Sequence, residues 1–319
     1  MDKVINLEIP HVGELIFESY NTPGLFQCAL VSETWKILAE NVLIKRWKGK
    51  MLLACQNGET KVVELLLERC NSEESGLNIK SKNGSTAFLE ACEKGHKDVV
   101  KLLLDHYERI DLNARNNFGS TAFMMACQKG HTDVVQLLLN HSKRIDLNAR
   151  DNWKMTAFML ACTVGHKDVV QLLLDHPEIE LNARDDTEFN VFMMACAQGH
   201  KDVLQLLLDN PDKIEPNQLN ARTTCVNGWT ACMFASFNGH TDVAQLLLER
   251  CTSEHLNATD NNGRTALMLA CLNGNKDVVQ LLLNNSEAVI ELDLRDDFGH
   301  TAIDMAFADD IEKLLLEHL

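Results

Sequence analysis

Residues 118–152, FGSTAFMMACQKGHTDVVQLLLNHSKRIDLNARDN, decide the fold, because the chain repeats them. The next residues, 153–186, read WKMTAFMLACTVGHKDVVQLLLDHPEIELNARDD and follow the same order of residue types. The pattern continues in both directions, and its clearest mark is a run of three leucines. These runs lie at 65–67, 102–104, 137–139, 172–174, 206–208, 246–248, 281–283 and 314–316. Eight units at a usual spacing of 35 residues predict a repeat protein.

Each unit predicts two helices and a loop. In the quoted unit a short apolar helix follows Thr121 and ends at Gly130, where a residue without Cβ can take the left-handed conformation. The second helix starts near Asp133, whose charge opposes the helix dipole in the first turn, and its valines and leucines form a buried face. Residues 145–152, IDLNARDN, then predict an extended piece and a turn that project as a hairpin.

This pattern resembles the ankyrin repeat in its period, its Leu-Asn-Ala-Arg segments and its Gly-His pairs. The pairs lie at 95–96, 130–131, 165–166, 199–200 and 239–240. The resemblance covers residues from about 50 to 319 and implies an all-α class: a solenoid of helix-turn-helix plus β-hairpin units. Two departures stand out. The family's Thr-Pro-Leu-His appears as Thr121-Ala122-Phe123-Met124, and Asn190 replaces threonine in the fifth unit, which we expect to weaken that position.

The expected ankyrin region is 49–319, and its first and last units differ from the others. We place the units at 49–82, 83–117, 118–152, 153–186, 187–226, 227–261, 262–297 and 298–319. The first unit lacks the leading hairpin, so another segment must cover its open end. The eighth lacks the Gly-His turn and carries acids that predict a solvated outer side, namely Asp309, Asp310, Glu312 and Glu317.

Residues 1–50 do not fit the repeat. Breakers at Pro10 and at residues 21–24, NTPG, divide this segment into about three short helices, and its apolar surface needs a partner to cover it. The segment resembles an F-box, because Phe17 is followed by Leu25, Val31 and Trp35 at steps of 8, 14 and 18, the family's own spacing. Ile9-Pro10 stands where the family has Leu-Pro. The resemblance covers residues 5–48 and implies three short helices.

An F-box docks on the Skp adaptor of a cullin-RING ubiquitin ligase. The resemblance therefore implies that the chain is a substrate-recognition subunit, with Skp-type adaptor and cullin as partners and a protein target for ubiquitination. The residues implied for the adaptor contact are Ile9, Pro10, Leu15, Ile16, Phe17, Leu25, Leu30, Val31 and Trp35. Two alternatives remain: a non-enzymatic scaffold or inhibitor whose front helices only cap the array, and a bacterial or viral F-box effector acting on a host ligase.

The charge distribution limits the partners. The net charge is -16, and residues 1–50 contribute six acids and six bases, so the whole excess of acid lies in the repeats. An acidic array repels phosphate backbones, which argues against nucleic-acid binding and favours a basic or mixed-charge protein target. The chain shows no secretion signal and no apolar run near the ~18 residues of a membrane span. We therefore expect the cytoplasm, the nucleus, or a host cytosol for an effector, and no membrane partner.

Cysteine and histidine recur in register and raise the possibility of a metal or catalytic site. Cys92 and His96, like three later pairs, are four residues apart, a spacing that zinc ligands or a Cys-His nucleophile can use. No third ligand or orienting carboxylate belongs to the pattern. We interpret the cysteines as packing residues and the histidines as residues that fix the loops. With no phosphate loop or hydrolase motif either, we expect no enzyme, no catalytic residue, no metal and no cofactor.

Variable apolar residues on the loops indicate where a target binds. Large side chains gather on the expected turn tips and helix ends of units three to seven, where exposed aromatics suit a binding hot spot. The predicted target-binding residues are Phe118, Trp153, Met155, Phe189, Trp229, Phe237 and Leu272. The alternative is that each ring packs on the next loop and stiffens the array. Loop asparagines such as Asn113 and Asn148 are either sites for an asparaginyl hydroxylase or, as we favour, structural hydrogen-bonding groups.

Overall fold

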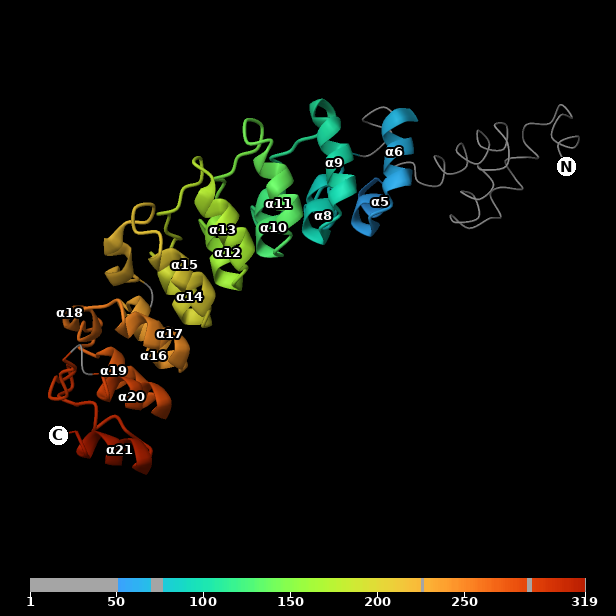
Figure 1. Ribbon diagram of the computed structural model, residues 1–319. Coiled ribbons are helices and arrows are strands. Elements are labelled where there is room, and N and C mark those ends of the chain that lie inside the picture. The colour runs from blue at the N-terminus through green and yellow to red at the C-terminus, as the bar shows by residue number, and fades with distance from the viewer. Residues whose placement is uncertain (1–50, 70–76, 225–226, 286–288, 319) are drawn as a thin grey trace, which may run out of the picture. The chain divides into compact units, whose positions relative to one another are not determined.

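The computed structural model describes residues 51–69, 77–224, 227–285 and 289–318. In these residues the chain forms short helices that lie side by side in pairs and are joined by loops (Figure 1). The chain divides into two compact units. One contains the described residues through Ala126 and residues 133–145, and the other contains residues 127–132 and the described residues from 146 onward.

The helices follow one another in the order that the repeats predict. They are α5 (Met51–Asn57), α6 (Thr60–Arg69), α8 (Ala87–Lys94), α9 (Lys97–Asp105), α10 (Ala122–Gln128), α11 (Thr132–Leu139), α12 (Ala157–Val164), α13 (Lys167–Asp175), α14 (Val191–Gln198), α15 (Lys201–Leu208), α16 (Ala231–Asn238), α17 (Thr241–Leu248), α18 (Ser253–Leu256), α19 (Ala266–Leu272), α20 (Lys276–Leu283) and α21 (Asp309–Leu316). Two 3₁₀ turns, η1 (Tyr107–Arg109) and η2 (Pro216–Asn220), lie in loops. Within the described residues, no helix is long and apolar enough to cross a membrane.

The pair α12 and α13 shows why the sequence folds this way. The Thr156 side chain accepts a hydrogen bond from the Met159 amide at 3.3 Å and caps α12 at its N-terminus. Gly165 ends α12 in the left-handed conformation, with φ 85°. Helix α13 then buries one face, made of Val169, Val170, Leu173 and Leu174. Burial of each such side chain contributes about 1.5–3 kcal/mol relative to leaving it exposed.

Successive helix pairs stack within each compact unit. In the first unit α5 packs against α8, and α6 packs against α9. In the second unit α12, α14, α16 and α19 stack in that order as an inner layer, and α13, α15, α17 and α20 form the second layer. Phenylalanines at one repeat position, such as Phe158 and Phe192, are buried between the layers. The predicted stacking of two-helix repeats is therefore confirmed.

The loops contain turns, but no β-strand occurs in the part of the chain that the structure describes. At residues 116–120, for example, the Asn116 amide donates to the Ser120 carbonyl at 3.0 Å, and the Gly119 amide donates to the Asn116 carbonyl at 3.0 Å. These two bonds close a tight turn, but they are too few to make a ladder. The predicted hairpins thus take the form of hairpin-like turns.

The eighth unit departs from the expected pattern. The backbone amide and the hydroxyl of Thr301 both donate to Asp304 Oδ2 at 2.8 Å, and the following residues form turns instead of a first helix. Phe307, which the repeat register places at the packing position of the other units' cysteines, is consequently 81% exposed. Ala308 then stands at the N-cap of α21 without a capping side chain.

Contrary to expectation, Asn190 does not weaken the fifth unit. Its Oδ1 accepts the Met193 amide at 3.0 Å, so asparagine caps α14 as Thr86, Thr156 and Thr265 cap α8, α12 and α19. Its Nδ2 also donates to the Gln218 carbonyl at 2.6 Å, a bond to the following loop that a threonine hydroxyl is too short to copy. The substitution adds a connection to that loop.

Candidate protein-binding surface

The Gly-His pairs join each repeat to the preceding one. His200, at the N-cap of α15, places its Nε2 3.0 Å from the Thr163 carbonyl oxygen. Because a carbonyl only accepts, Nε2 must be the donor. Gly165 makes this approach possible, since a Cβ there would lie 2.5 Å from His200 Nδ1. The predicted loop-fixing role of the histidines is confirmed, and it extends to the neighbouring repeat.

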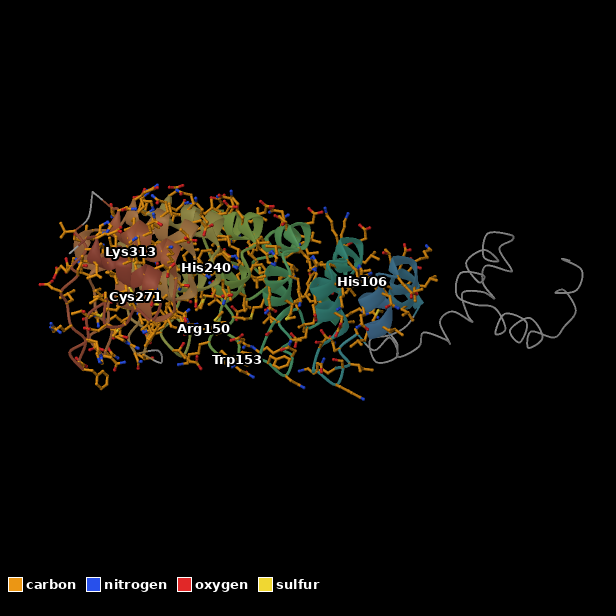
Figure 2. All side chains as sticks on the ribbon, turned by 90° about the horizontal axis from the view of Figure 1, so that it is seen from below. His106, Arg150, Trp153, His240, Cys271 and Lys313 are labelled. Atoms are coloured by element: carbon orange, nitrogen blue, oxygen red, sulfur yellow. The ribbon has the colours of Figure 1, made fainter. Side chains whose placement is uncertain are left out.

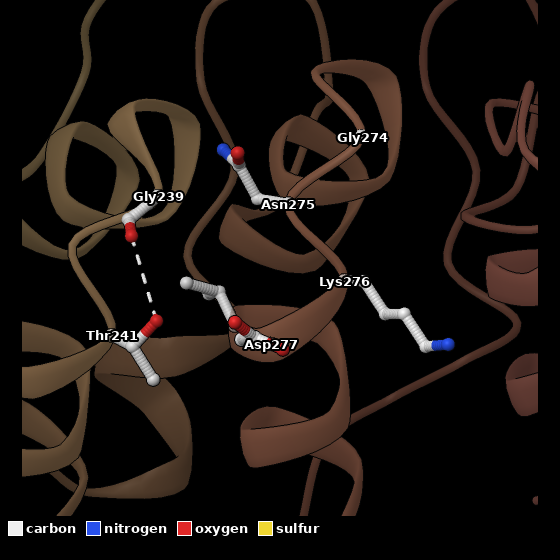
Figure 3. Close-up of a pocket in the computed structure, with 7 residues that line it drawn as sticks. Gly239, Thr241, Gly274, Asn275, Lys276 and Asp277 are labelled. Atoms are coloured by element: carbon white, nitrogen blue, oxygen red, sulfur yellow. Dashed lines mark hydrogen bonds between the residues drawn. The ribbon is translucent and has the colours of Figure 1, made fainter.

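The same bond recurs along the chain. It links His96 Nε2 to the Gln56 carbonyl at 3.0 Å, His166 Nε2 to Gln128 at 3.0 Å and His240 Nε2 to Ala197 at 3.1 Å. In the seventh unit Asn275 takes the histidine's place and donates to the equivalent carbonyl, that of Phe237, at 2.6 Å. Figure 3 shows Asn275 and Gly239 at a small pocket of this junction, where the Thr241 hydroxyl donates to the Gly239 carbonyl at 3.5 Å. An amide therefore replaces the imidazole.

The repeated cysteines are packing residues. Burial raises the pKa of the Cys127, Cys162 and Cys196 thiols. A nucleophilic or metal-binding cysteine needs a lowered thiol pKa, so burial acts against both roles. Of the paired histidines, the rings of His96, His166 and His200 bond to carbonyls of the preceding repeat. Within the described ranges, no three His, Cys, Asp or Glu side chains lie close enough together to hold a metal ion.

The loop asparagines connect each repeat to the following one. Asn148 Nδ2 donates to the Glu178 carbonyl at 2.7 Å, and its Oδ1 accepts the Glu180 amide at 2.8 Å. Asn257 makes the same two bonds with Val289 and Glu291, at 2.7 and 3.0 Å. Each side-chain amide thus uses both its Nδ2 donor and its Oδ1 acceptor. These asparagines do form structural hydrogen bonds, but the prediction that the bonds lie within their own turn is wrong, because the partners belong to the next loop.

An aspartate, buried or half-buried, shapes most of the turn tips in the second compact unit. Asp151 Oδ1 accepts the amides of Trp153 and Met155, both at 2.9 Å. The same arrangement recurs at the equivalent positions Asp185, Asp260 and Asp296. In the sixth unit the Thr223 hydroxyl replaces the carboxylate and accepts the Trp229 amide at 3.2 Å, across a loop that is two residues longer. These anchors fix which side chain stands at each tip.

Comparison with known families agrees with this geometry. Residues 37–116, 108–185 and 180–260 match a family described as ankyrin repeats (3 copies), and residues 247–306 match a related description, ankyrin repeats (many copies). The chain belongs to the ankyrin-repeat family. Its repeats form a protein-interaction domain. No F-box family matches the chain.

One solved structure shows how far the ankyrin fold extends. The crystal structure of the human ASB11 ankyrin repeat domain is similar to this chain with a TM-score of 0.61 and 21% sequence identity. The similarity covers 74% of this chain and 98% of that one. At this identity the likeness concerns the fold alone. No curated protein sequence matches the chain.

Two of the predicted target-binding residues are exposed on turn tips of the ankyrin array. Phe118 is 53% exposed and Trp153 is 51% exposed. Figure 2 shows Trp153 on the side of the molecule from which the loops project. Met155, two residues further on, is half-buried. The residue after Trp153, Lys154, has φ 61°, and Glu188 at the next tip has φ 65°.

Trp229 is buried, which contradicts the expectation that it stands on an exposed turn. It is only 7% exposed, and its Nε1 donates to Asp260 Oδ2 at 3.1 Å. Its ring lies 5.2 Å from the Phe234 ring and 4.9 Å from the Phe237 ring, between centroids. Phe189 joins them at 4.8 Å from Phe234. Here the alternative holds: the rings pack on one another and stiffen units five and six.

Leu272 lines a cavity that none of the other predicted target-binding residues lines. It lines a cavity of about 360 Å³ at units seven and eight, together with Phe298, Met305 and Phe307. Phe298 and Phe307 are 79% and 81% exposed, more than Phe118 or Trp153. The prediction selected Leu272 but neither phenylalanine.

The predicted adaptor contact lies outside the described residues. This applies to Ile9, Pro10, Leu15, Ile16, Phe17, Leu25, Leu30, Val31 and Trp35. Their role remains a prediction.

Proposed function

We propose that the chain is the substrate-recognition subunit of a Skp/cullin/F-box type ubiquitin ligase. The ankyrin array binds a protein target, and residues 5–48 dock a Skp-type adaptor that connects to the cullin. The adaptor part is supported by the spacing of Phe17, Leu25, Val31 and Trp35. The ligase's partners supply the chemistry of ubiquitin transfer, and the chain acts in the cytoplasm or the nucleus.

The turn tip at Trp153 carries the target-binding half of this proposal. A half-exposed indole offers a large apolar area at a small cost in side-chain entropy. Its backbone is held by the buried Asp151 carboxylate, so the position is preorganised. Lys154 holds a left-handed conformation that favours glycine, and such local strain gathers at functional sites. These observations together support a contact surface there.

A capture experiment tests the adaptor half. Purified Skp adaptor and cullin are incubated with the full chain and with the variant Leu25→Ala plus Trp35→Ala. We expect capture by the wild type and its loss in the variant, while circular dichroism of the array stays the same. Failure of the wild type to capture adaptor would remove the ligase role and leave a binding array.

Chemical cross-linking tests the target half, because Lys154 supplies an amine next to Trp153. In cell extract, we expect an amine-reactive cross-linker to join Lys154 to a partner protein, and Trp153→Ala to abolish this cross-link without changing adaptor capture. The matched control is Val164→Ala, which removes an exposed apolar side chain at a helix end. Cross-links that survive in Trp153→Ala place the contact elsewhere.

The second candidate function is a scaffold or inhibitor whose front segment only covers the array. One observation favours it: the first ankyrin match begins at residue 37, inside the segment 5–48. In that case the variant Leu25→Ala plus Trp35→Ala lowers the stability of the first repeats and the wild type captures no adaptor. An effector acting on a host ligase shares the first proposal's contacts, and it is distinguished by which species' adaptor is captured.

A further inference from the structure

The cavity at units seven and eight holds the two most exposed aromatic rings of the described residues. Phe298 is 79% exposed and Phe307 is 81% exposed, yet both line the same cavity of about 360 Å³. Leu272 and Met305 add further apolar surface. Ligand pockets of proteins begin at about 300 Å³, so this volume suits one or two side chains and not a large molecule.

Both rings are held in place by local structure. The Phe298 amide donates to Asp296 Oδ1 at 3.0 Å, and the His300 amide donates to the same oxygen at 2.7 Å, which fixes the turn. Phe307 follows the turns that Asp304 stabilises through Thr301. The exposure of the rings is therefore a consequence of defined hydrogen bonds, and binding does not have to order the backbone first.

The ionised groups that line the cavity have an excess of negative charge. Hydrogen bonds from the backbone and hydroxyl of Thr301 lower the pKa of Asp304. For Asp296, burial raises the pKa, but hydrogen bonds from His300 and Phe298 outweigh it and lower the pKa overall. The one arginine in the lining, Arg264, donates from Nε and Nη2 to Asp260 Oδ2 at 2.9 and 2.8 Å, so its charge is already compensated.

Rings and carboxylates together select a cation with an apolar stem. The face of a phenylalanine attracts a guanidinium or ammonium group, and lysine and arginine bury their methylenes along apolar surface while the charged head stays polar. An uncharged apolar group gains nothing from the carboxylates of Asp296 and Asp304, and an anion is repelled. We propose that this cavity binds an arginine or lysine side chain of a protein partner. The proposal deepens the target-binding half of the proposed function and is independent of the adaptor half.

Binding of a short basic peptide to the full chain tests the proposal. The probe is tetra-arginine with blocked ends, and isothermal titration calorimetry measures its affinity at a fixed ionic strength. The test variant is Phe298→Ala plus Phe307→Ala, which keeps every charge and therefore every non-specific electrostatic attraction of this acidic protein. We expect it to weaken binding about fivefold or more, because it removes both cation–π partners. The control, Leu53→Ala plus Ile79→Ala, removes exposed apolar side chains that do not line the cavity and should bind tetra-arginine as the wild type does.

Three results would overturn the proposal. The first is equal binding of tetra-arginine by the wild type and the Phe298→Ala plus Phe307→Ala variant. The second is a higher affinity for a blocked neutral leucine peptide than for tetra-arginine, which identifies a purely apolar site. The third is dimerisation of the wild type, measured by sedimentation, that the same variant abolishes, since the occupant is then a second copy of this chain.

Other readouts keep this test separate from the proposed function. Because both rings are largely exposed, we expect the double variant to keep the wild-type melting temperature and to capture the Skp adaptor normally. A failed peptide test with normal adaptor capture and an intact Lys154 cross-link rejects the cavity alone. Loss of the Lys154 cross-link and of adaptor capture with normal peptide binding rejects the proposed function alone.

Discussion

At the scale of single residues, the contact between Gly165 and His200 explains why the two residue types recur as a pair. The glycine belongs to one repeat and the histidine that needs its missing Cβ belongs to the next. The glycine therefore serves two purposes: it ends α12 in the left-handed conformation, and it leaves room for the imidazole that reaches the Thr163 carbonyl. Each Gly-His pair thus takes part in two junctions: its histidine bonds to the preceding repeat, and its glycine leaves room for the histidine of the following repeat.

The chain itself supplies a control for this junction, because Asn275 replaces the histidine in the seventh unit. We expect His200→Ala to lower the free energy of unfolding by about 1–2 kcal/mol, since it leaves a carbonyl unpaired. His200→Asn should recover most of this loss. Urea unfolding measures both values. Equal losses for the alanine and asparagine variants would mean that packing of the ring, and not the hydrogen bond, holds the junction.

The two tryptophans of the predicted binding surface should respond differently to truncation. We expect Trp229→Ala to lower the free energy of unfolding by about 3–5 kcal/mol, because it empties a buried ring position and leaves Asp260 without one donor. Trp153→Ala should change it by no more than about 0.5 kcal/mol, because the ring is half exposed. Thermal and urea unfolding measure the difference. A large loss for Trp153→Ala would assign that ring to the fold.

At the scale of elements, the turn tips differ in how easily the backbone adopts them. Gly119 and Gly299 take the left-handed conformation at their tips with φ 80° and 83°, whereas the equivalent Lys154 and Glu188 have φ 61° and 65°. A residue with a Cβ loses about 1–2 kcal/mol there. The array keeps this conformational cost at Lys154, next to Trp153, and at Glu188, next to Phe189.

Lys154→Gly should therefore stabilise the array by up to about 1 kcal/mol. Relief of the strain gives about 1–2 kcal/mol, and the extra freedom of glycine in the unfolded chain removes about 0.5–1 kcal/mol of it. Lys154→Ala, which keeps a Cβ, should show no gain. Urea unfolding of the three proteins decides this, and equal stability of the glycine and alanine variants contradicts the strain argument.

The sequence predicts the elements well and their surfaces less well. Period, caps and leucine faces are properties of neighbouring residues, so the helix pairs could be read from 118–152 alone. The burial of Trp229 could not, because it depends on Phe234, Phe237 and Asp260 meeting in space. The exposure of Phe307 follows from the turns that take the place of a first helix in the eighth unit, although its Thr-Ala start matches the other units. One signal was available: an Asp or Asn before most of the tips marks the anchored turns, as at Asn116, Asp151, Asp185, Asp260 and Asp296.

At the scale of the whole molecule, the buried thiols make stability depend on alkaline pH. Burial raises the pKa of Cys55 and Cys271 from 9.0 to about 12. Below pH 9 both thiols are protonated in the folded and unfolded chain, and stability does not change. Between about pH 9 and 12 the unfolded chain releases protons that the folded chain keeps, so stability falls as pH rises.

The variant Cys55→Ala plus Cys271→Ala isolates this effect. From pH 8 to pH 10 we expect the wild type to lose about 3 kcal/mol more than the variant, at about 1.4 kcal/mol per thiol for each pH unit above 9. Urea unfolding at the two pH values measures the difference, and comparison with the variant removes the contribution of other groups. Parallel losses in the two proteins would show that the thiols ionise in the folded state.

Ala308 affects where local unfolding of the array begins. At this N-cap position His96, His166, His200, His240 and Asn275 donate to the preceding repeat, and a methyl group cannot. The step from α20 to α21 keeps the ion pair of Lys276 with Asp310, which is exposed and contributes little. We expect amide hydrogen exchange to be faster in α21 than in α14 or α16, as local opening begins there. A basic partner bound by Phe298 and Phe307, in the segment that leads into α21, would slow that exchange, and recognition would then stabilise this end of the array.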